Sequence, residues 1–173
     1  MEEPVWREMR EGDLEGVMAL AAEVHPGLPE RIDVFADRLA IFPAGCQVLS
    51  SQAGIEGYAV SHPAKLFEPP PLDEVLGALP PGTDGYYIHD VVVSPRLRGA
   101  GHARIGVYHA LDAGAAFTET GLIAVYGTTP FWERFGFADR TKSVRPEKLR
   151  LYGPDARYMV RRKSAIEFTP RAG

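Results

Sequence analysis

A strand, a glycine-containing turn and a helix follow one another directly between residues 86 and 115, and this succession constrains the fold more than any other feature. Tyr86–Val93 is aromatic and β-branched, ends in three valines and is apolar on both faces, which is typical of a central strand covered on both sides. Pro95 ends the strand, and after Arg96-Leu97-Arg98-Gly99-Ala100-Gly101 the pattern predicts a helix to about Ala115.

The other predicted elements complete a mixed α/β order. The residue pattern predicts helices at 13–24, with Asp13 as N-cap, and at 29–39, where Pro29 stands in the first turn. A third helix is predicted at 130–135, and strands at 5–9, 46–51, 55–61, 122–126, 137–139 and 156–162. The chain of 173 residues fits one domain, and the order β-α-α-β-β-β-α-β-α-β-β makes it a mixed α/β domain over residues 1–163.

Two segments stand apart from this order. Residues 63–85 contain six prolines around one short helical candidate, Leu72–Leu79. This segment is either a plain surface connection or an insertion that shapes a substrate entrance. Residues 164–173 have the character of a frayed terminal tail.

Composition excludes several classes of protein. The 19 basic and 23 acidic residues give a net charge of −4, so the overall field does not favour nucleic acid. A single cysteine excludes an internal disulfide framework, and the histidines lack metal-ligand spacing, so we expect no metal. No apolar run of about 18 residues could span a membrane, and the acidic start lacks an apolar signal region. We therefore expect a cytoplasmic protein without membrane or nucleic-acid partners.

The turn before the predicted helix has the chemistry of a pyrophosphate cradle. Glycines at 99 and 101 allow a phosphate to approach backbone N–H groups at a helix start, where the helix dipole adds partial positive charge. Arg96 and Arg98 add full charges. The Lys and Ser or Thr of a P-loop are absent, and Arg104 stands where a dinucleotide fingerprint has its third glycine. Taken alone, the same residues also fit a solvated turn.

Four segments together resemble the GNAT superfamily of acyl-CoA-dependent N-acetyltransferases. The family's pyrophosphate motif, Gln/Arg-x-x-Gly-x-Gly/Ala, is matched by Arg96, Gly99 and Gly101. The strand His89–Val93 resembles the family's fourth strand, residues 126–137 resemble its second cofactor motif, and residues 151–159 resemble its closing strands. The resemblance runs from the first strand to Arg162, and it implies a mixed, mostly antiparallel sheet of six to seven strands, flanked by helices and splayed between the fourth and fifth strands.

The resemblance also implies where acetyl-CoA binds. The pantetheine arm would lie in the splay and pair with backbone groups of the fourth strand as an added strand does; the valines there also fit a purely structural role in the core. The cofactor-binding residues that it implies are Val91, Val92, Val93, Arg96, Arg98, Gly99, Ala100, Gly101, His102, Ala103, Phe131 and Trp132.

Transfer to an amine needs a proton acceptor and a donor for the leaving thiolate. His89 and Asp90 are the candidate bases, and strand alternation places them on opposite faces; each also fits a structural role. The family's usual acid, a tyrosine four residues before the Gly-Phe pair, is replaced by Trp132. Tyr126 is the substitute candidate, although it also fits a core or rim position.

These observations predict an acetyl-CoA-dependent N-acetyltransferase that moves the acetyl group directly to a primary amine of a small molecule or peptide. The alternative, motivated by Trp132, is a catalytically degenerate acyl-CoA-binding sensor or regulatory module. A structural or interaction domain without a cofactor is a third hypothesis. Relatives often form dimers, so a homodimer is also consistent with the resemblance.

Overall fold

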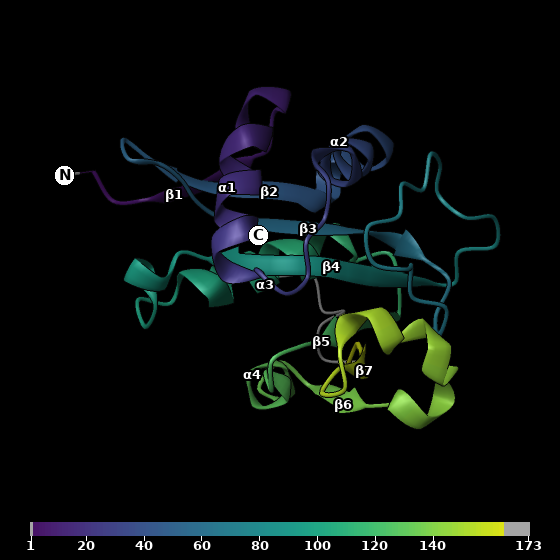
Figure 1. Cartoon of the computed structure of the whole chain (residues 1–173). Helices are drawn as coiled ribbons and strands as arrows, with labels where there is room; N and C mark the ends of the chain where they lie inside the picture. The colour runs from purple at the N-terminus through teal and green to yellow at the C-terminus, as the bar shows by residue number, and fades with distance from the viewer. Residues whose placement is uncertain (1, 165–173) are drawn as a thin grey trace, which may run out of the picture.

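The computed structural model describes residues 2–164, so Met1 and residues 165–173, which hold most of the predicted tail, lie outside the described residues. Residues 2–164 form seven strands and four α-helices, whose arrangement Figure 1 shows. In chain order they are β1 (Val5–Glu8), α1 (Leu14–Val24), α2 (Ile32–Ile41), β2 (Cys46–Ser51), β3 (Gly54–Ala64), β4 (Gly85–Val93), α3 (His102–Ala113), β5 (Glu119–Ala124), α4 (Thr129–Glu133), β6 (Phe137–Asp139) and β7 (Arg157–Arg162).

All seven strands form one open sheet in the order β1-β2-β3-β4-β5-β7-β6. Every neighbouring pair is antiparallel except β4 and β5, which are parallel and are joined by the crossover helix α3. The predicted fold class and element order are therefore confirmed. In residues 2–164 no helix has both the length and the apolar character needed to cross a membrane.

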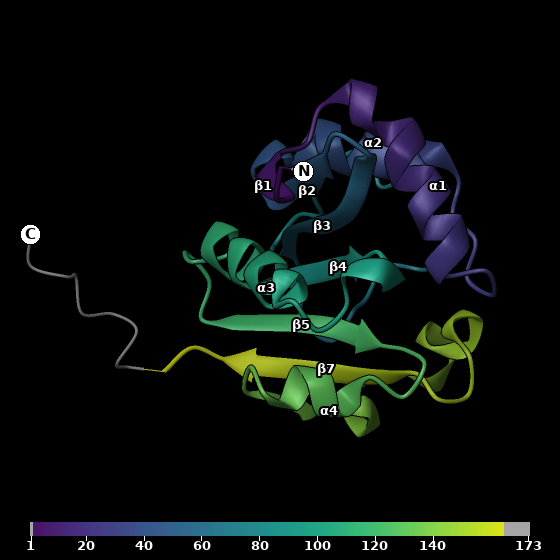
Figure 2. The same cartoon turned by 90° about the vertical axis from the view of Figure 1, so that its left-hand side faces the viewer.

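Helices α1 and α3 lie on opposite sides of the central strands (Figure 2), and each covers an apolar cluster. On one face, Val17 of α1 and Phe35 of α2 pack with Tyr58 of β3 and Val92 of β4. On the other face, Val107 of α3 belongs to the cluster that contains the β4 and β5 residues Ile88 and Leu122. Burial on both faces explains why β4 has almost no polar alternation in the sequence.

Helix α3 carries a glycine where the side chains of Trp6 in β1 and Val91 in β4 approach it. A Cβ built on Gly106 would lie 2.7 Å from the Trp6 ring and 3.2 Å from Val91. The same tryptophan donates its indole N–H to the His102 carbonyl at the start of the helix, at 3.2 Å. The contact ties the N-terminus of α3 to β1.

The connection between β3 and β4 is shorter than the sequence suggested and contains no helix. Strand β3 extends through Ala64 and β4 begins at Gly85, so the connection comprises residues 65–84. The helix predicted over Leu72–Leu79 is wrong for a physical reason. Asp73 has a φ of 62°, which interrupts right-handed winding, and Asp37 of α2 accepts the backbone N–H groups of residues 76 and 77 at 2.9 Å each.

Helix α1 begins where the sequence predicts, whereas α2 begins later. Asp13 occupies the N-cap position of α1, but its side chain makes no capping hydrogen bond, because its carboxylate accepts the Arg10 backbone N–H and two N–H groups of Arg7. Helix α2 begins at Ile32 and not at Pro29, because Arg31 is extended and donates its backbone N–H to Asp73 at 2.8 Å. A long-range polar contact therefore decides where α2 begins.

Candidate active site

Strands β4 and β5 separate after a short shared ladder, and a cavity fills the space between them. Their parallel pairing covers only Tyr86–Ile88 of β4 and Thr120–Leu122 of β5, although β4 continues to Val93. A cavity of about 820 Å³ opens beyond the last pair, with residues 88–93 on one side and 122–126 on the other. We call this cavity the wedge. It is the splay that the resemblance implies.

The glycine turn and the start of α3 form one end of the wedge. Gly99 and Gly101 both have a φ of 85°, a conformation that disfavours any side chain with a Cβ. Nothing lies within 4 Å of an ideal Cβ at either position, so the turn is open to a ligand. Helix α3 begins directly after it, and the first backbone N–H groups of a helix have no partner within the helix. The arrangement is suited to bind an anion.

Three guanidinium groups line the wedge, but only one of them belongs to the set implied by the sequence. Arg98 lines the cavity as expected, and Arg104 of α3 and Arg134 after α4 join it. Arg96 does not line it, because its side chain forms an ion pair with the buried carboxylate of Glu56 in β3. The sequence offered no pattern linking Arg134 to the turn, since the two are brought together only by the packing of α4.

The structure gathers most of the other expected cofactor residues around the same cavity. Those that line the wedge are Val91, Val92, Val93, Gly99, Gly101, His102, Ala103, Phe131 and Trp132, whereas Ala100 does not. Trp132 is 8% exposed and packs edge-on against Phe131 and Phe137. The position that carries the acid tyrosine in the family's pattern is thus held by an apolar ring cluster.

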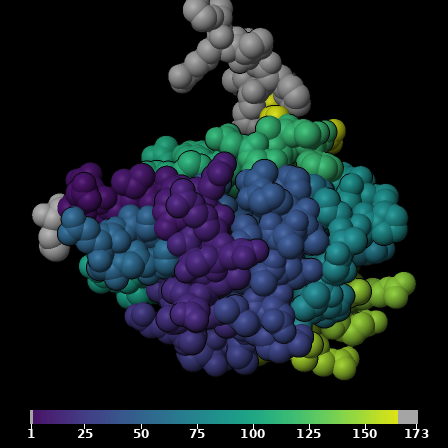
Figure 3. Space-filling view, turned by 90° about the horizontal axis from the view of Figure 1, so that it is seen from above, coloured from purple at the N-terminus to yellow at the C-terminus, as the bar shows by residue number. Residues whose placement is uncertain are grey.

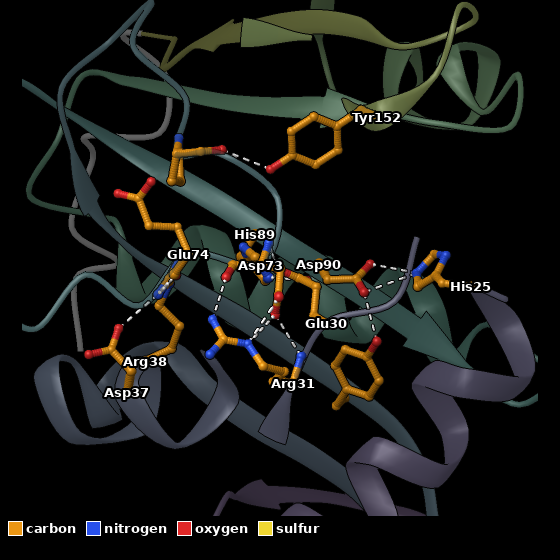
Figure 4. A network of polar contacts seen from close by, with 12 residues as sticks. His25, Glu30, Arg31, Asp37, Arg38, Asp73, Glu74, His89, Asp90 and Tyr152 are labelled. Carbon is orange, nitrogen blue, oxygen red and sulfur yellow. Dashed lines mark hydrogen bonds and ion pairs between the residues drawn. The ribbon is translucent and has the colours of Figure 1, made fainter. Parts of the chain in front are cut away.

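A β-bulge turns two neighbouring side chains of β4 toward the same side. Val60 of β3 pairs with Asp90, and Ser61 pairs with Ile88, so His89 has no partner in the register. A bulge of this kind cancels the normal alternation of side chains. The expectation that His89 and Asp90 occupy opposite faces is therefore wrong: both contact the segment between α1 and α2 (Figure 4).

Each of the two side chains has a specific partner from that segment. His89 Nε2 lies 2.8 Å from Glu30 Oε1, and the His89 side chain is only 3% exposed. Asp90 lies 3.0 Å from His25 Nε2 and accepts the hydroxyl of Tyr58 at 2.7 Å. Asp90 is thus hydrogen-bonded by both His25 and Tyr58. His89 bonds to Glu30 and thereby ties the α1–α2 segment to β4.

The buried charges alter the proton affinities of this cluster. Burial lowers the pKa of His25, but the charge of Asp90, the hydrogen bond to it and the charge of Glu30 together raise that pKa above its ordinary value. Burial raises the pKa of Glu30, but the charge and hydrogen bond of His89, the backbone hydrogen bond from Asp73 and the charge of Arg38 together leave that pKa lowered. Burial and the charge of Asp90 raise the pKa of the Tyr58 hydroxyl well above its usual range. His25 is thereby a better proton acceptor than an isolated histidine.

Tyr126 lies two residues beyond the end of β5, in a left-handed conformation with a φ of 54°. It is 55% exposed, and its ring stacks on His25 with centroids 5.6 Å apart and planes at 14°. It also lines the wedge. The structure therefore brings Asp90 and Tyr126 together through His25, which the sequence gave no reason to single out as a proton acceptor.

A second, smaller cavity of about 350 Å³ lies between α1, the α1–α2 segment and β3. His25 and Asp90 are the two residues that line both this cavity and the wedge. In the described part of the chain no group of three or more His, Cys, Asp or Glu side chains is placed to hold a metal ion. The functional groups at the junction are the Asp90 carboxylate, the His25 imidazole and the nearby Tyr126 phenol.

Neither a protein-family model nor a curated protein sequence matches this chain. Solved structures do. The loading GNATL domain of CurA from Lyngbya majuscula superposes with a TM-score of 0.74 at 13% identity, covering 93% of this chain and 98% of that one. Naa50 of Arabidopsis thaliana, solved with the bisubstrate analogue CoA-Ac-MVNAL, gives 0.64 at 17% identity, with 94% and 99% covered.

The N-acetylglutamate synthase of Neisseria gonorrhoeae, solved with coenzyme A and N-acetyl-glutamate, gives a TM-score of 0.70 at 15% identity. The match covers 94% of this chain and 35% of that one. These likenesses establish that the chain has the GNAT fold. At such identities they carry over the arrangement of helices and strands, and the chemistry must be argued from the site.

Proposed function

We propose that the protein is an acyl-CoA-dependent N-acyltransferase that moves an acetyl group from acetyl-CoA to a primary amine of a small molecule or peptide. One observation carries the proposal. The wedge joins an anion-binding turn at one end to a polar His25–Asp90 junction at the other. Acetyl-CoA has its pyrophosphate and its thioester at opposite ends of an extended pantetheine arm, so its chemistry matches this layout.

The proposed cofactor contacts follow from the geometry. The pyrophosphate lies on the turn at Gly99 and Gly101, near Arg98. The pantetheine amides pair with backbone groups of Val91 and Val93, which have no ladder to β5. The Val91 N–H is also the donor that we assign to the oxyanion of the tetrahedral intermediate.

We assign proton transfer to the His25–Asp90 pair, with His89 as a positioning residue. The amine nitrogen forms a C–N bond with the thioester carbon and loses one proton to the pair. The C–S bond then breaks, the electron pair leaves with sulfur, and the thiolate takes a proton from Tyr126, which regains one from the pair. Direct transfer fits because the single cysteine, Cys46, is fully buried in the core, so its thiol is not available to carry the acyl group.

Calorimetric titration with acetyl-CoA and a thiol-release assay over an amine panel test this proposal. Binding together with amine-dependent release of CoA is expected. If acetyl-CoA fails to bind at millimolar concentration, both cofactor-based functions are refuted.

A second candidate function is an acyl-CoA-binding sensor or regulatory module, which the apolar surroundings of Trp132 favour. It predicts tight acetyl-CoA binding without CoA release above background for any amine. A Trp132→Tyr variant separates the two further, because a gain of at least tenfold in turnover would indicate that a missing acid limits an existing activity.

A further inference from the structure

The smaller cavity has a composition that selects among amines. Its walls are mostly apolar, and no lysine or arginine is among the residues that line it. Its polar side chains are the carboxylates of Glu30 and Asp90, the His25 imidazole and the Tyr58 hydroxyl. The apolar lining comes from Met18, Ala21, Ala22, Pro26, Leu28, Pro29 and Phe35.

Three of these polar groups belong to one hydrogen-bonded cluster, whereas Glu30 bonds to His89. His25 bonds to Asp90 (Figure 4), and the Tyr58 hydroxyl donates to Asp90 at 2.7 Å. Since His25 and Asp90 also line the wedge, this part of the cavity faces the space where we place the thioester. A substrate that extends along the cavity therefore presents its polar group to the thioester and its body to the apolar walls.

From these observations we infer that the 350 Å³ cavity is the acceptor pocket, and that it takes a compact primary amine with an apolar body and no carboxylate. This inference rests on the proposed function and names its substrate class. An amine nitrogen, neutral or protonated, is attracted by Asp90 and Glu30. The carboxylate of an amino acid is repelled by both and meets no lysine or arginine, and the one imidazole of the lining, His25, is already paired with Asp90. The volume admits an aryl-alkyl amine such as 2-phenylethylamine.

The cavity is bounded by a rigid frame. Glu30 accepts the backbone N–H of Asp73 at 3.0 Å and the His89 imidazole at 2.8 Å, which ties the α1–α2 segment to both β4 and the 65–84 connection. Arg31 adds an ion pair to Asp73 at 3.0 Å. The connection (teal) accordingly lies beside the N-terminal part of the chain (purple to blue) on the surface seen in Figure 3. A pocket held in this way discriminates by size.

Binding is measured first, because it does not depend on catalysis. In methyl-labelled protein without acetyl-CoA, 2-phenylethylamine is expected to shift the signals of Met18, Ala21 and Leu28, whereas glutamate at the same concentration is not. With acetyl-CoA present, kcat/KM for 2-phenylethylamine is expected to exceed that for glutamate by at least 100-fold.

A matched pair of variants on α1 tests the location. Ala21 lines the cavity, and Ala19 is exposed on the same helix outside it. Ala21→Leu is expected to raise KM for 2-phenylethylamine at least tenfold, whereas KM for ethylamine should change less than threefold. The affinity for acetyl-CoA should stay unchanged. Ala19→Leu is expected to leave all three values unchanged.

The outcomes separate the two proposals. Acetylation of peptides or amino acids in preference to the apolar amine, or equal effects of Ala21→Leu on both amines, would refute this inference and leave the proposed function standing. If acetyl-CoA and the apolar amine both bind but no amine of the panel is acetylated, the acceptor role is refuted together with the proposed function.

Discussion

Gly99 offers a direct test of the anion site, because a charge can be introduced there without a steric clash. The residue is exposed, and no atom lies within 4 Å of its ideal Cβ. Gly99→Glu and Gly99→Gln have side chains of the same length, and both pay the same backbone strain for a φ of 85°, about 1–2 kcal/mol. The difference between them is therefore the charge alone.

The expected size of that difference follows from Coulomb's law. Two unit charges 4 Å apart in water interact by about 1 kcal/mol, and a pyrophosphate presents two charges to the new carboxylate. The total of about 2 kcal/mol corresponds to an acetyl-CoA Kd about 30-fold higher for Gly99→Glu than for Gly99→Gln.

Calorimetry at low salt measures both Kd values, and a second titration at about 1 M salt checks their origin. There the Debye length falls to about 3 Å, so the two affinities are expected to converge to within a few-fold. Equal affinities of the two variants at low salt would refute the placement of the pyrophosphate on this turn.

Three further predictions follow from the polar contacts. The folded-state pKa of His25 is raised, so protonated His25 stabilises the fold fully below about pH 6.5, and this stabilisation is lost as the pH rises through the raised pKa. The urea midpoint of the wild type should therefore fall as the pH rises through this range, whereas that of His25→Gln should not. Arg98→Gln should raise the acetyl-CoA Kd about five- to tenfold and Arg96→Gln less than twofold, since only Arg98 lines the wedge; equal effects would contradict the geometry. Asp37→Ala should lower the free energy of unfolding by about 3–5 kcal/mol, because it leaves the Arg38 guanidinium, which is 0% exposed, without its ion pair; a loss under 1 kcal/mol in urea unfolding would contradict this.

Local sequence signals determined the element order and the glycine turn before α3. The valines of β4 require burial on both faces, and Pro95 and the two positive-φ glycines end the strand and begin α3 within a few residues. Each of these preferences acts over neighbouring residues, so it can be read without knowing what lies across the sheet. The same holds for the strand at Cys46–Ser51, whose bounds match the prediction.

Only the tertiary structure decided how the polar site is assembled. The bulge at His89 depends on register with β3, the pairing of His25 with Asp90 joins residues 65 positions apart, and Arg96 is drawn from the cavity by Glu56 on another strand. Side-chain carboxylates of Asp37 and Asp73 likewise bind backbone groups far along the chain and override local helix preference. Such contacts depend on distance in space and leave no periodic trace in the sequence. The element order and the glycine turn could therefore be predicted, and the pairing of His25 with Asp90 could not.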